Sequence, residues 1–366
     1  MDLPHRQCSS HGVTWAGPLE ERALPNAYIS GTGGYVPEQI VTNDDLRDGY
    51  GIDTTHDWIV KRTGIEARRF APEGTCSADL AVPAARKAIA NAGLTEADVD
   101  MIVFATLSPK HAFPGDGVLL QEKLGLCEQG RFIPAMDLRN QCSGFLYGLA
   151  AASSMVQSGM VRHVLLVGGE THSAALDLST RGRTVSSLFG DGAGAVIVSP
   201  TDEDRGIRGW YLGADGRFAD VLCQKVWDMS KRPFFPVPEG REGPGRVEPE
   251  MMWAHMEGRQ VFKNAVERMI QVLVSACWDQ KIDLADIDLF CFHQANMRIN
   301  QMVAQTMGIP EEKLIHNIQK YGNTTAATIP LLLAEAEESG RLVRGMKVAC
   351  VAFGSGFTWG SAILDW

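Results

Sequence analysis

The chain has 366 residues, 45% of them hydrophobic, so it can bury a large core and is expected to form two subdomains. Its net charge of −10 excludes the overall basic character of a protein that binds nucleic acid through its general field. No apolar run approaches the roughly twenty residues that a membrane span requires, so we expect no transmembrane segment.

Residues 1–26 mix prolines and glycines with polar side chains. They contain no basic segment followed by an apolar stretch, so we do not expect a signal peptide. We predict that these residues form an extension outside the folded core, and the sequence does not indicate its role.

Two parts of the chain repeat each other. Helical patterns at 81–92 and 261–278 are each followed by an acidic turn and a short apolar strand. Three pairs of segments match in the same order along the chain, which indicates duplication of one α/β unit: 97–104 with 285–292, 161–168 with 345–352, and 194–197 with 360–363.

The repeat predicts the architecture. Uninterrupted apolar strands at 164–167 and 348–352 indicate sheets that are covered on both faces. Helical patterns between strands indicate parallel crossovers. Two such α/β halves packed face to face form a five-layered α/β/α/β/α sandwich. We predict a first half at 27–200 and a second half at 201–366, with an insertion at about 221–252.

Cys142 lies at a strand-to-helix junction, because apolar residues 132–136 precede it and small, apolar residues 146–155 follow it. The first amides of a helix lack partners and carry partial positive charge, so they can lower the pKa of a thiol and hold an oxyanion. The alternative is a small cysteine buried in the core, which is a common position for an unpaired Cys.

Two polar residues occupy similar junctions later in the chain. His293 ends a short apolar strand, and Asn323 lies near the start of a small-residue helix. Each has a structural alternative, because histidines are often satisfied within cores and asparagines often cap helices. Together, Cys142, His293 and Asn323 form a set suited to acyl transfer.

The internal repeat also relates these residues to each other. Aligning Ser158-Gly159 with Ser339-Gly340 places Cys142 opposite Asn323. Both would then begin equivalent helices, and a pseudo-twofold axis would bring the two helix starts together between the halves.

Between residue 27 and the C-terminus the sequence resembles the ketoacyl-ACP synthase III family of thiolase-fold condensing enzymes. Seven motifs in the same order carry the resemblance: Gly31-Thr-Gly-Gly-Tyr-Val-Pro37, Asp57-Trp-Ile-Val-Lys-Arg-Thr-Gly-Ile65, Cys142-Ser-Gly-Phe145, Phe189-Gly-Asp-Gly-Ala-Gly194, His293-Gln-Ala-Asn296, Gly322-Asn-Thr324 and Phe353-Gly-Ser-Gly-Phe-Thr-Trp-Gly360.

The resemblance implies a thiolase fold and a two-step Claisen condensation. Cys142 would be acylated by an acyl-CoA, with the backbone N–H groups of Cys142 and Ser355 as the oxyanion hole. His293 and Asn323 would then donate hydrogen bonds to the enolate formed when malonyl-ACP or malonyl-CoA loses its carboxylate. Phe357, which the resemblance places near the acyl pocket, would press on that carboxylate.

The resemblance also implies how substrates bind. The coenzyme A site of the family is matched by Trp58, Arg62 and Arg181. These residue types suit that ligand, because Trp can stack on adenine and Arg can pair with phosphate. Lys263 and Arg298 match positions implied in docking of the acyl carrier protein. Each of these arginines and lysines could instead be a solvated surface charge.

Some features concern specificity and assembly. Phe113 matches a residue that crosses a homodimer interface and closes the partner's acyl pocket, although it could be an interface phenylalanine without a role in specificity. Several relatives carry lysines where this chain has Gln305 and Thr306. The insertion at 221–252 is rich in proline and aromatic residues, so it could be a lid, a binding loop or a surface excursion without function. We expect an acyl group other than acetyl.

The eight cysteines show no CxxC spacing, so we expect reduced thiols and a cytoplasmic location. Cys291 and His293 share a strand face, but no third or fourth ligand is suggested nearby, so we expect no metal. No cofactor is expected, and acyl-CoA enters as a substrate.

Two alternatives to this condensation stay open. One is an acyltransferase that passes its acyl group to an acceptor other than malonyl thioester, and the other is a non-catalytic partner subunit. A biosynthetic thiolase would be expected to carry a second cysteine in the C-terminal glycine loop, where this chain has Phe353-Gly-Ser-Gly-Phe357.

Overall fold

The computed structural model of this chain describes residues 25–226 and 252–366. Residues 1–24 of the predicted extension and residues 227–251 of the predicted insertion at 221–252 therefore lie outside the described residues.

The first sheet has five strands in the order β1-β7-β6-β4-β5. β4 is parallel to both β5 and β6, whereas β7 is antiparallel to both β1 and β6. The sheet is covered on both faces, and every residue of β6 is buried, as its uninterrupted apolar run predicts. The bounds are β1 Asn26–Tyr35, β4 Met101–Ala105, β5 Ala135–Leu138, β6 Val164–Glu170 and β7 Gly192–Thr201.

The second sheet has four strands in the order β11-β12-β13-β8. β11 and β12 are parallel, and the other two pairs are antiparallel. Parallel strands, as predicted, are therefore found in both sheets: β4, β5 and β6 in the first, and β11 and β12 in the second. Each sheet also contains antiparallel strands. The bounds are β8 Gly206–Ala214, β11 Leu289–Phe292, β12 Lys347–Gly354 and β13 Thr358–Asp365.

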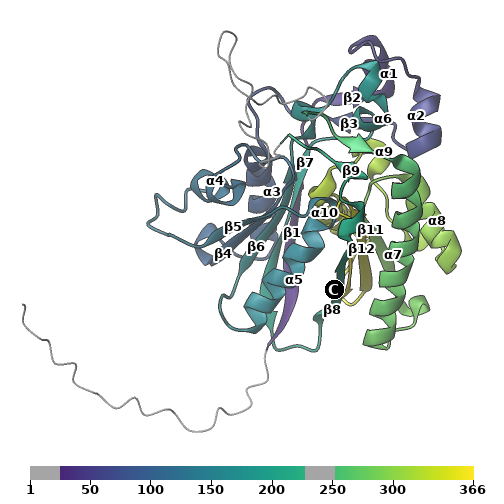
Figure 1. Cartoon of the computed structure of the whole chain (residues 1–366). Coiled ribbons are helices and arrows are strands. Elements are labelled where there is room, and N and C mark those ends of the chain that lie inside the picture. The colour runs from purple at the N-terminus through teal and green to yellow at the C-terminus, as the bar shows by residue number, and fades with distance from the viewer. Residues whose placement is uncertain (1–24, 227–251) are drawn as a thin grey trace, which may run out of the picture.

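Helices form three layers around the two sheets (Figure 1). α3 and α4 cover the outer face of the first sheet, α5 and α10 lie between the sheets, and α7 and α8 cover the outer face of the second. The five-layered α/β/α/β/α prediction is confirmed. The bounds are α3 Ser77–Asn91, α4 Asp116–Lys123, α5 Gly144–Gln157, α7 Gly258–Gln280, α8 Met297–Met307 and α10 Thr328–Glu338.

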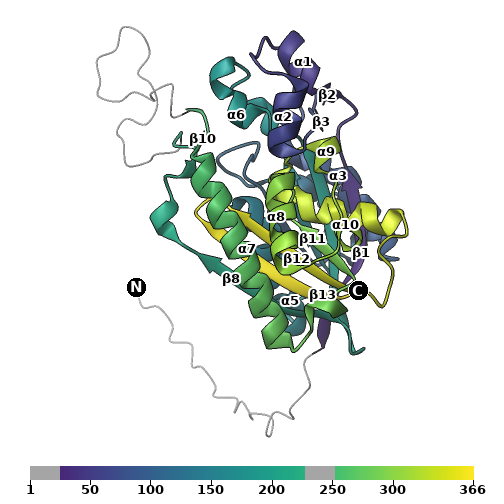
Figure 2. The same cartoon turned by 90° about the vertical axis from the view of Figure 1, so that its right-hand side faces the viewer.

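A smaller group of elements sits at one end of this sandwich, as both views show (Figure 2). Its own apolar cluster includes Leu46, Ile59, Ile65 and Ile318, all fully buried. The elements are β2 Ile40–Thr42, α1 Asn43–Asp48, α2 His56–Thr63, β3 Ala67–Arg69, α6 Arg183–Ser186 and α9 Ile318–Tyr321. A separate two-stranded sheet, β9 Leu222–Cys223 and β10 His255–Met256, packs against the same cluster through Met256. Within the described ranges, no helix has the length and apolar character that crossing a membrane requires.

The repeat is visible in the structure, but one inferred register is wrong. α5 is preceded by the short 3-10 helix Gln141–Ser143, and α10 is preceded by the 3-10 helix Thr325–Ala327. Cys142 is therefore equivalent to Ala326, not to Asn323, which precedes its 3-10 helix by two residues. The C-terminal ends of α5 and α10 align as expected, but α10 is three residues shorter, 11 instead of 14, so the alignment slips at the helix starts.

Candidate active site

Cys142 lies in the 3-10 helix between β5 and α5, and this short helix contacts both β12 and the 3-10 helix Thr325–Ala327. The glycine loop after β12 approaches it closely. A Cβ on Gly354 would lie 2.6 Å from the Cβ and 3.2 Å from the Sγ of Cys142, so only glycine fits there. The hydroxyls of Ser143 and Thr358 lie 2.7 Å apart and join the loop to the start of α5.

The thiol of Cys142 is less acidic than its helix-start position predicts. Burial, with a smaller contribution from the carboxylate of Glu170, raises its pKa to about 12. The backbone N–H groups of Cys142 and Ser355 face the sulfur and lower its pKa, but their effect is smaller. Desolvation of the charged form therefore outweighs the effect of the helix-start amides on the pKa of this thiol.

His293 follows β11 directly, and its backbone N–H donates to the carbonyl of Val351 at 2.8 Å. Its Nδ1 lies 2.6 Å from the hydroxyl of Thr328. Its Nε2 is buried and has no hydrogen-bond partner among the described residues. Burial lowers the pKa of His293 to about 3, so the imidazole is neutral at physiological pH.

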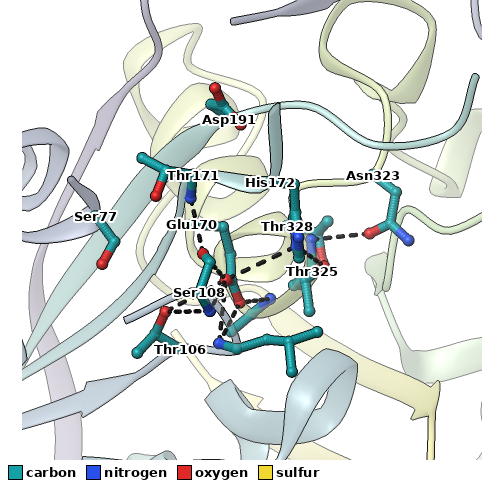
Figure 3. Close-up of polar contacts among 12 residues, drawn as sticks. Ser77, Thr106, Ser108, Glu170, Thr171, His172, Asp191, Asn323, Thr325 and Thr328 are labelled. Atoms are coloured by element: carbon teal, nitrogen blue, oxygen red, sulfur yellow. Dashed lines mark hydrogen bonds and ion pairs between the residues drawn. The ribbon is translucent and has the colours of Figure 1, made fainter. Parts of the chain in front are cut away.

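Asn323 lies in the turn that leads into α10. Its backbone N–H donates to the Leu188 carbonyl at 2.8 Å, and its own carbonyl accepts from the N–H of Gly190 at 3.1 Å. Its side-chain oxygen accepts from the N–H of Thr325 at 2.8 Å (Figure 3). Because that bond fixes which end of the amide is the acceptor, the NH₂ group is the end available to a ligand.

The structure brings together the elements that carry these residues. Gly168, near the end of β6, allows the turn before α10 to approach, since a Cβ there would lie 2.2 Å from the carbonyl oxygen of Ala326. A Cβ on Gly144, at the start of α5, would lie 3.7 Å from the Cβ of Ala326. The Cys142 helix, β12 and the Asn323 turn therefore meet where the two sheets face each other.

Glu170 is a buried site residue that the sequence analysis missed. It ends β6 and accepts hydrogen bonds from the N–H groups of Leu107 and Ser108 at 3.1 Å and from the Ser108 hydroxyl at 2.6 Å. Burial raises its pKa to about 7. A carboxylate that ends a wholly apolar strand was the available signal, since buried acidic residues are rare unless they are hydrogen-bonded.

Trp58 and Arg62 lie on one turn of α2, which the Thr55 hydroxyl caps by accepting from the N–H of Trp58 at 3.1 Å. The Arg62 guanidinium lies 4.2 Å from the centre of the indole. A second guanidinium over the same indole, at 5.3 Å, belongs to Arg183. Arg183 also donates to the carbonyl of Asp53 at 2.7 Å.

Arg181 has different neighbours. Its Nε pairs with the Asp177 carboxylate at 2.7 Å, and its guanidinium lies 5.7 Å from the ring centre of Trp253. The predicted residue Arg181 therefore lies beside Trp253, and the guanidinium of Arg183 lies beside Trp58.

Lys263 and Arg298 are exposed on the neighbouring helices α7 and α8. The Arg298 guanidinium lies 5.8 Å from the ring centre of Phe262, the residue before Lys263. The side chain of Asn296 caps α8 and also donates to the carbonyl of Arg62 at 3.0 Å, which joins this surface to α2. The two predicted docking residues therefore lie on one surface.

The remaining predicted residues occupy distinct environments. Phe357 is buried in a stack, 4.9 Å from Phe218 and 4.8 Å from Phe353 between ring centres. The Ser355 hydroxyl donates to the Leu222 carbonyl. Phe113, in the loop before α4, is 86% exposed, so it closes no pocket within its own chain.

Comparison with known proteins agrees with this geometry. The family model described as 3-Oxoacyl-[acyl-carrier-protein (ACP)] synthase III matches residues 136–216, and the model of its C-terminal part matches residues 277–366. The Beta-ketoacyl-[acyl-carrier-protein] synthase III 1 of Vibrio cholerae is 39% identical over 336 residues, which cover 92% of this chain and 98% of that protein.

The chain belongs to the ketoacyl-ACP synthase III family. Its fold is similar to that of the 3-oxoacyl-[acyl-carrier-protein] synthase III of Aquifex aeolicus, with a TM-score of 0.81 and 35% identity over 93% of this chain and all of that one. It is also similar to the priming β-ketosynthase of the R1128 polyketide pathway, with a TM-score of 0.82 and 29% identity over 95% of this chain and 98% of that one. Members of the family are condensing acyltransferases, and the fold prediction is confirmed.

Proposed function

We propose that this ketoacyl-ACP synthase III condenses an acyl group from acyl-CoA with a malonyl thioester, through an acyl-enzyme on Cys142. The observation that supports this most is the pair of backbone N–H groups, of Cys142 and Ser355, that face the Cys142 sulfur. Two such donors are what the oxyanion of a thioester attacked by that sulfur requires.

In the first half-reaction, the Cys142 sulfur bonds to the thioester carbon and the bond to the CoA sulfur breaks. The thiol proton of Cys142 ends on the departing CoA thiol. The thiol is neutral before the reaction. The two amides therefore act by stabilising the negative charge that develops during attack, and they do not hold Cys142 as a thiolate beforehand.

In the second half-reaction, the malonyl thioester loses CO₂, and the enolate carbon attacks the acyl carbon on Cys142. The Cys142 sulfur leaves and takes up a proton. His293 and Asn323 are proposed as neutral donors to the enolate oxygen. When the Thr328 hydroxyl donates to Nδ1 of His293, the imidazole proton lies on Nε2, the atom that has no partner among the described residues. Phe357 is proposed to favour loss of the carboxylate's charge.

We propose that Trp58, Arg62 and Arg183 bind the nucleotide part of CoA. An indole flanked by two guanidinium groups offers a stacking surface and a positive charge for phosphate. Arg181, which lies beside Asp177 and Trp253, is proposed only as a secondary contact. The surface of Lys263 and Arg298 is proposed to dock an acidic acyl carrier protein.

We also propose a homodimer in which Phe113 reaches the partner's acyl pocket, because an exposed phenylalanine of this size is typical of an interface. The reaction uses only the residues of this chain and two thioesters, without a metal or organic cofactor. A cytoplasmic location would suit its free thiols and its carrier-protein substrate.

Two variants test the assignment of roles. Cys142→Ala should fold but gain no acyl mass when mixed with acyl-CoA. Asn323→Ala should gain acyl mass nearly normally but lose about 10²–10³ in the rate of malonyl decarboxylation, the usual cost of one oxyanion donor. Acylation of Cys142→Ala at the wild-type rate, or equal losses in both half-reactions for Asn323→Ala, would contradict the proposal.

A further inference from the structure

Thr325 contacts the supports of both proposed enolate donors. Its backbone N–H fixes the side-chain oxygen of Asn323 at 2.8 Å. Its carbonyl lies 3.0 Å from the Thr328 hydroxyl, and the same hydroxyl lies 2.6 Å from Nδ1 of His293, to which it gives its single proton when His293 acts as an Nε2–H donor. A small rotation of Thr325 would therefore move both Asn323 and the partner of His293.

Thr325 adopts a backbone conformation that it does not favour. Its φ is +47°, in the left-handed region, where a β-branched residue is a genuine outlier. Such a conformation is unfavourable for this residue type and persists only where its surroundings impose it. Thr325 is completely buried, so protein contacts must supply that constraint.

His172 supplies a contact from the other half of the molecule. It lies just after β6, and its Nε2 is 2.6 Å from the hydroxyl of Thr325 (Figure 3). Its ring packs against Phe189 at 4.7 Å between centres, so the imidazole is held from both sides. Glu170, two residues earlier, accepts from the N–H of Ala326 at 3.5 Å.

The hydrogen bond between His172 and the Thr325 hydroxyl joins two neutral groups. His172 is buried, and burial lowers its pKa to about 4, so the imidazole is uncharged at neutral pH. It lies 3.7 Å from the Glu170 carboxylate, but a neutral imidazole forms no ion pair with it. The proposed mechanism gives His172 no chemical step.

We propose that His172 is a positioning residue for the decarboxylation step, because its bond to Thr325 fixes the turn that orients both Asn323 and His293. The inference rests on the roles proposed above for Asn323 and His293. It assigns His172 mainly to the second half-reaction, since His172 bonds to Thr325, the partner of Asn323, although the Cys142 helix also packs against the Thr325–Ala327 helix.

The test is a comparison of both half-reactions in His172→Ala and in a matched control. His163 lies at the opposite end of β6, and its Nδ1 is 2.9 Å from the hydroxyl of Ser199, so His163→Ala removes the same kind of bond away from the Asn323 turn. Acyl transfer from acyl-CoA to Cys142 is read by intact mass, and decarboxylation by release of CO₂ from malonyl thioester.

His172→Ala should lower the decarboxylation rate about tenfold to a hundredfold, as a misplaced catalytic group does, while Cys142 acylation stays within about threefold of wild type. His163→Ala should leave both rates near wild type. Thr325→Val removes the same bond from the other partner and should reproduce the loss, and the double variant His172→Ala/Thr325→Val should be no worse than either single one.

Equal losses in both half-reactions, or additive losses in the double variant, would overturn the inference. Normal decarboxylation by both single variants while Asn323→Ala fails would overturn it and leave the proposed function intact. Normal decarboxylation by Asn323→Ala would contradict the proposed roles themselves, and with them the inference. Should His172→Ala not fold, Thr325→Val decides by the same criteria.

Discussion

At the scale of single residues, burial and nearby backbone N–H groups have opposite effects on the pKa of the Cys142 thiol. The sequence does not reveal which effect is larger. Cys142, His293 and Asn323 could be selected from their positions at the ends of elements, and the structure brings those elements together. The thiol pKa could not be predicted, because it depends on burial and on Glu170, a residue from another strand. The choice between Arg181 and Arg183 likewise depended on which side chain faces Trp58.

The pKa of the Cys142 thiol gives a testable pH dependence. Because burial raises that pKa to about 12, the thiolate fraction and the rate of alkylation by iodoacetamide should keep rising up to about pH 10. Mass spectrometry of the peptide that contains Cys142 measures the rate separately from the other cysteines. A plateau reached by about pH 8 would instead indicate a thiol activated in the free protein.

The two arginines near the indole of Trp58 should differ in their effect on acyl-CoA binding. Arg183→Ala removes a guanidinium that lies over the indole, so the KM for acyl-CoA should rise about tenfold, the scale of one charged contact. Arg181→Ala removes a side chain already paired with Asp177 and should raise KM less than threefold. The reverse order, measured in steady-state kinetics, would restore the sequence-based choice.

At the scale of elements, the meeting of two helix starts and one glycine loop builds the site. The duplicated strands and helices could be predicted from repeated apolar patterns. The register between Cys142 and Asn323 could not, because α10 is three residues shorter than α5 and the missing residues lie at its start. An alignment anchored on the residues that follow the two helices does not reveal whether the shorter helix lacks residues at its start or at its end.

In the glycine loop, acyl-enzyme formation should tolerate a substitution of Ser355 but not a substitution of the preceding residue, Gly354. Gly354→Ala places a Cβ within 2.6 Å of Cys142 and should displace the thiol or its backbone donors, so acyl-enzyme formation should fall about 10²-fold. Ser355→Ala keeps the backbone N–H and loses only the bond to Leu222, so acylation should stay within about threefold. A Gly354→Ala protein that acylates normally would show that the close approach is not required.

At the scale of the whole molecule, the five-layered sandwich brings residues from both halves together between the two sheets. Its surface also carries side chains that make no contribution to the core of their own chain. Phe113 is the clearest, since a phenylalanine 86% exposed contributes nothing to its own core. The sequence alone could not place it, because its proposed pocket belongs to a second chain.

Phe113→Ala should widen tolerance toward longer acyl-CoAs, because removing a bulky wall frees space. Each methylene buried there is worth roughly 0.8 kcal/mol, or about fourfold in selectivity. Acylation rates over a series of chain lengths measure this, with Phe132→Ala as a control because Phe132 is 84% exposed. An unchanged profile, together with a monomer in light scattering, would contradict the proposed shared pocket.

We propose above all that the acyl group on Cys142 is consumed by decarboxylative condensation. The most direct measurement is a single turnover of isolated acyl-enzyme with malonyl-ACP, following acyl loss from Cys142, CO₂ release and product mass together. We predict one CO₂ and one 3-oxoacyl-ACP for each acyl group lost. Transfer of the acyl group to an acceptor without release of CO₂ would contradict the account and identify an acyltransferase instead.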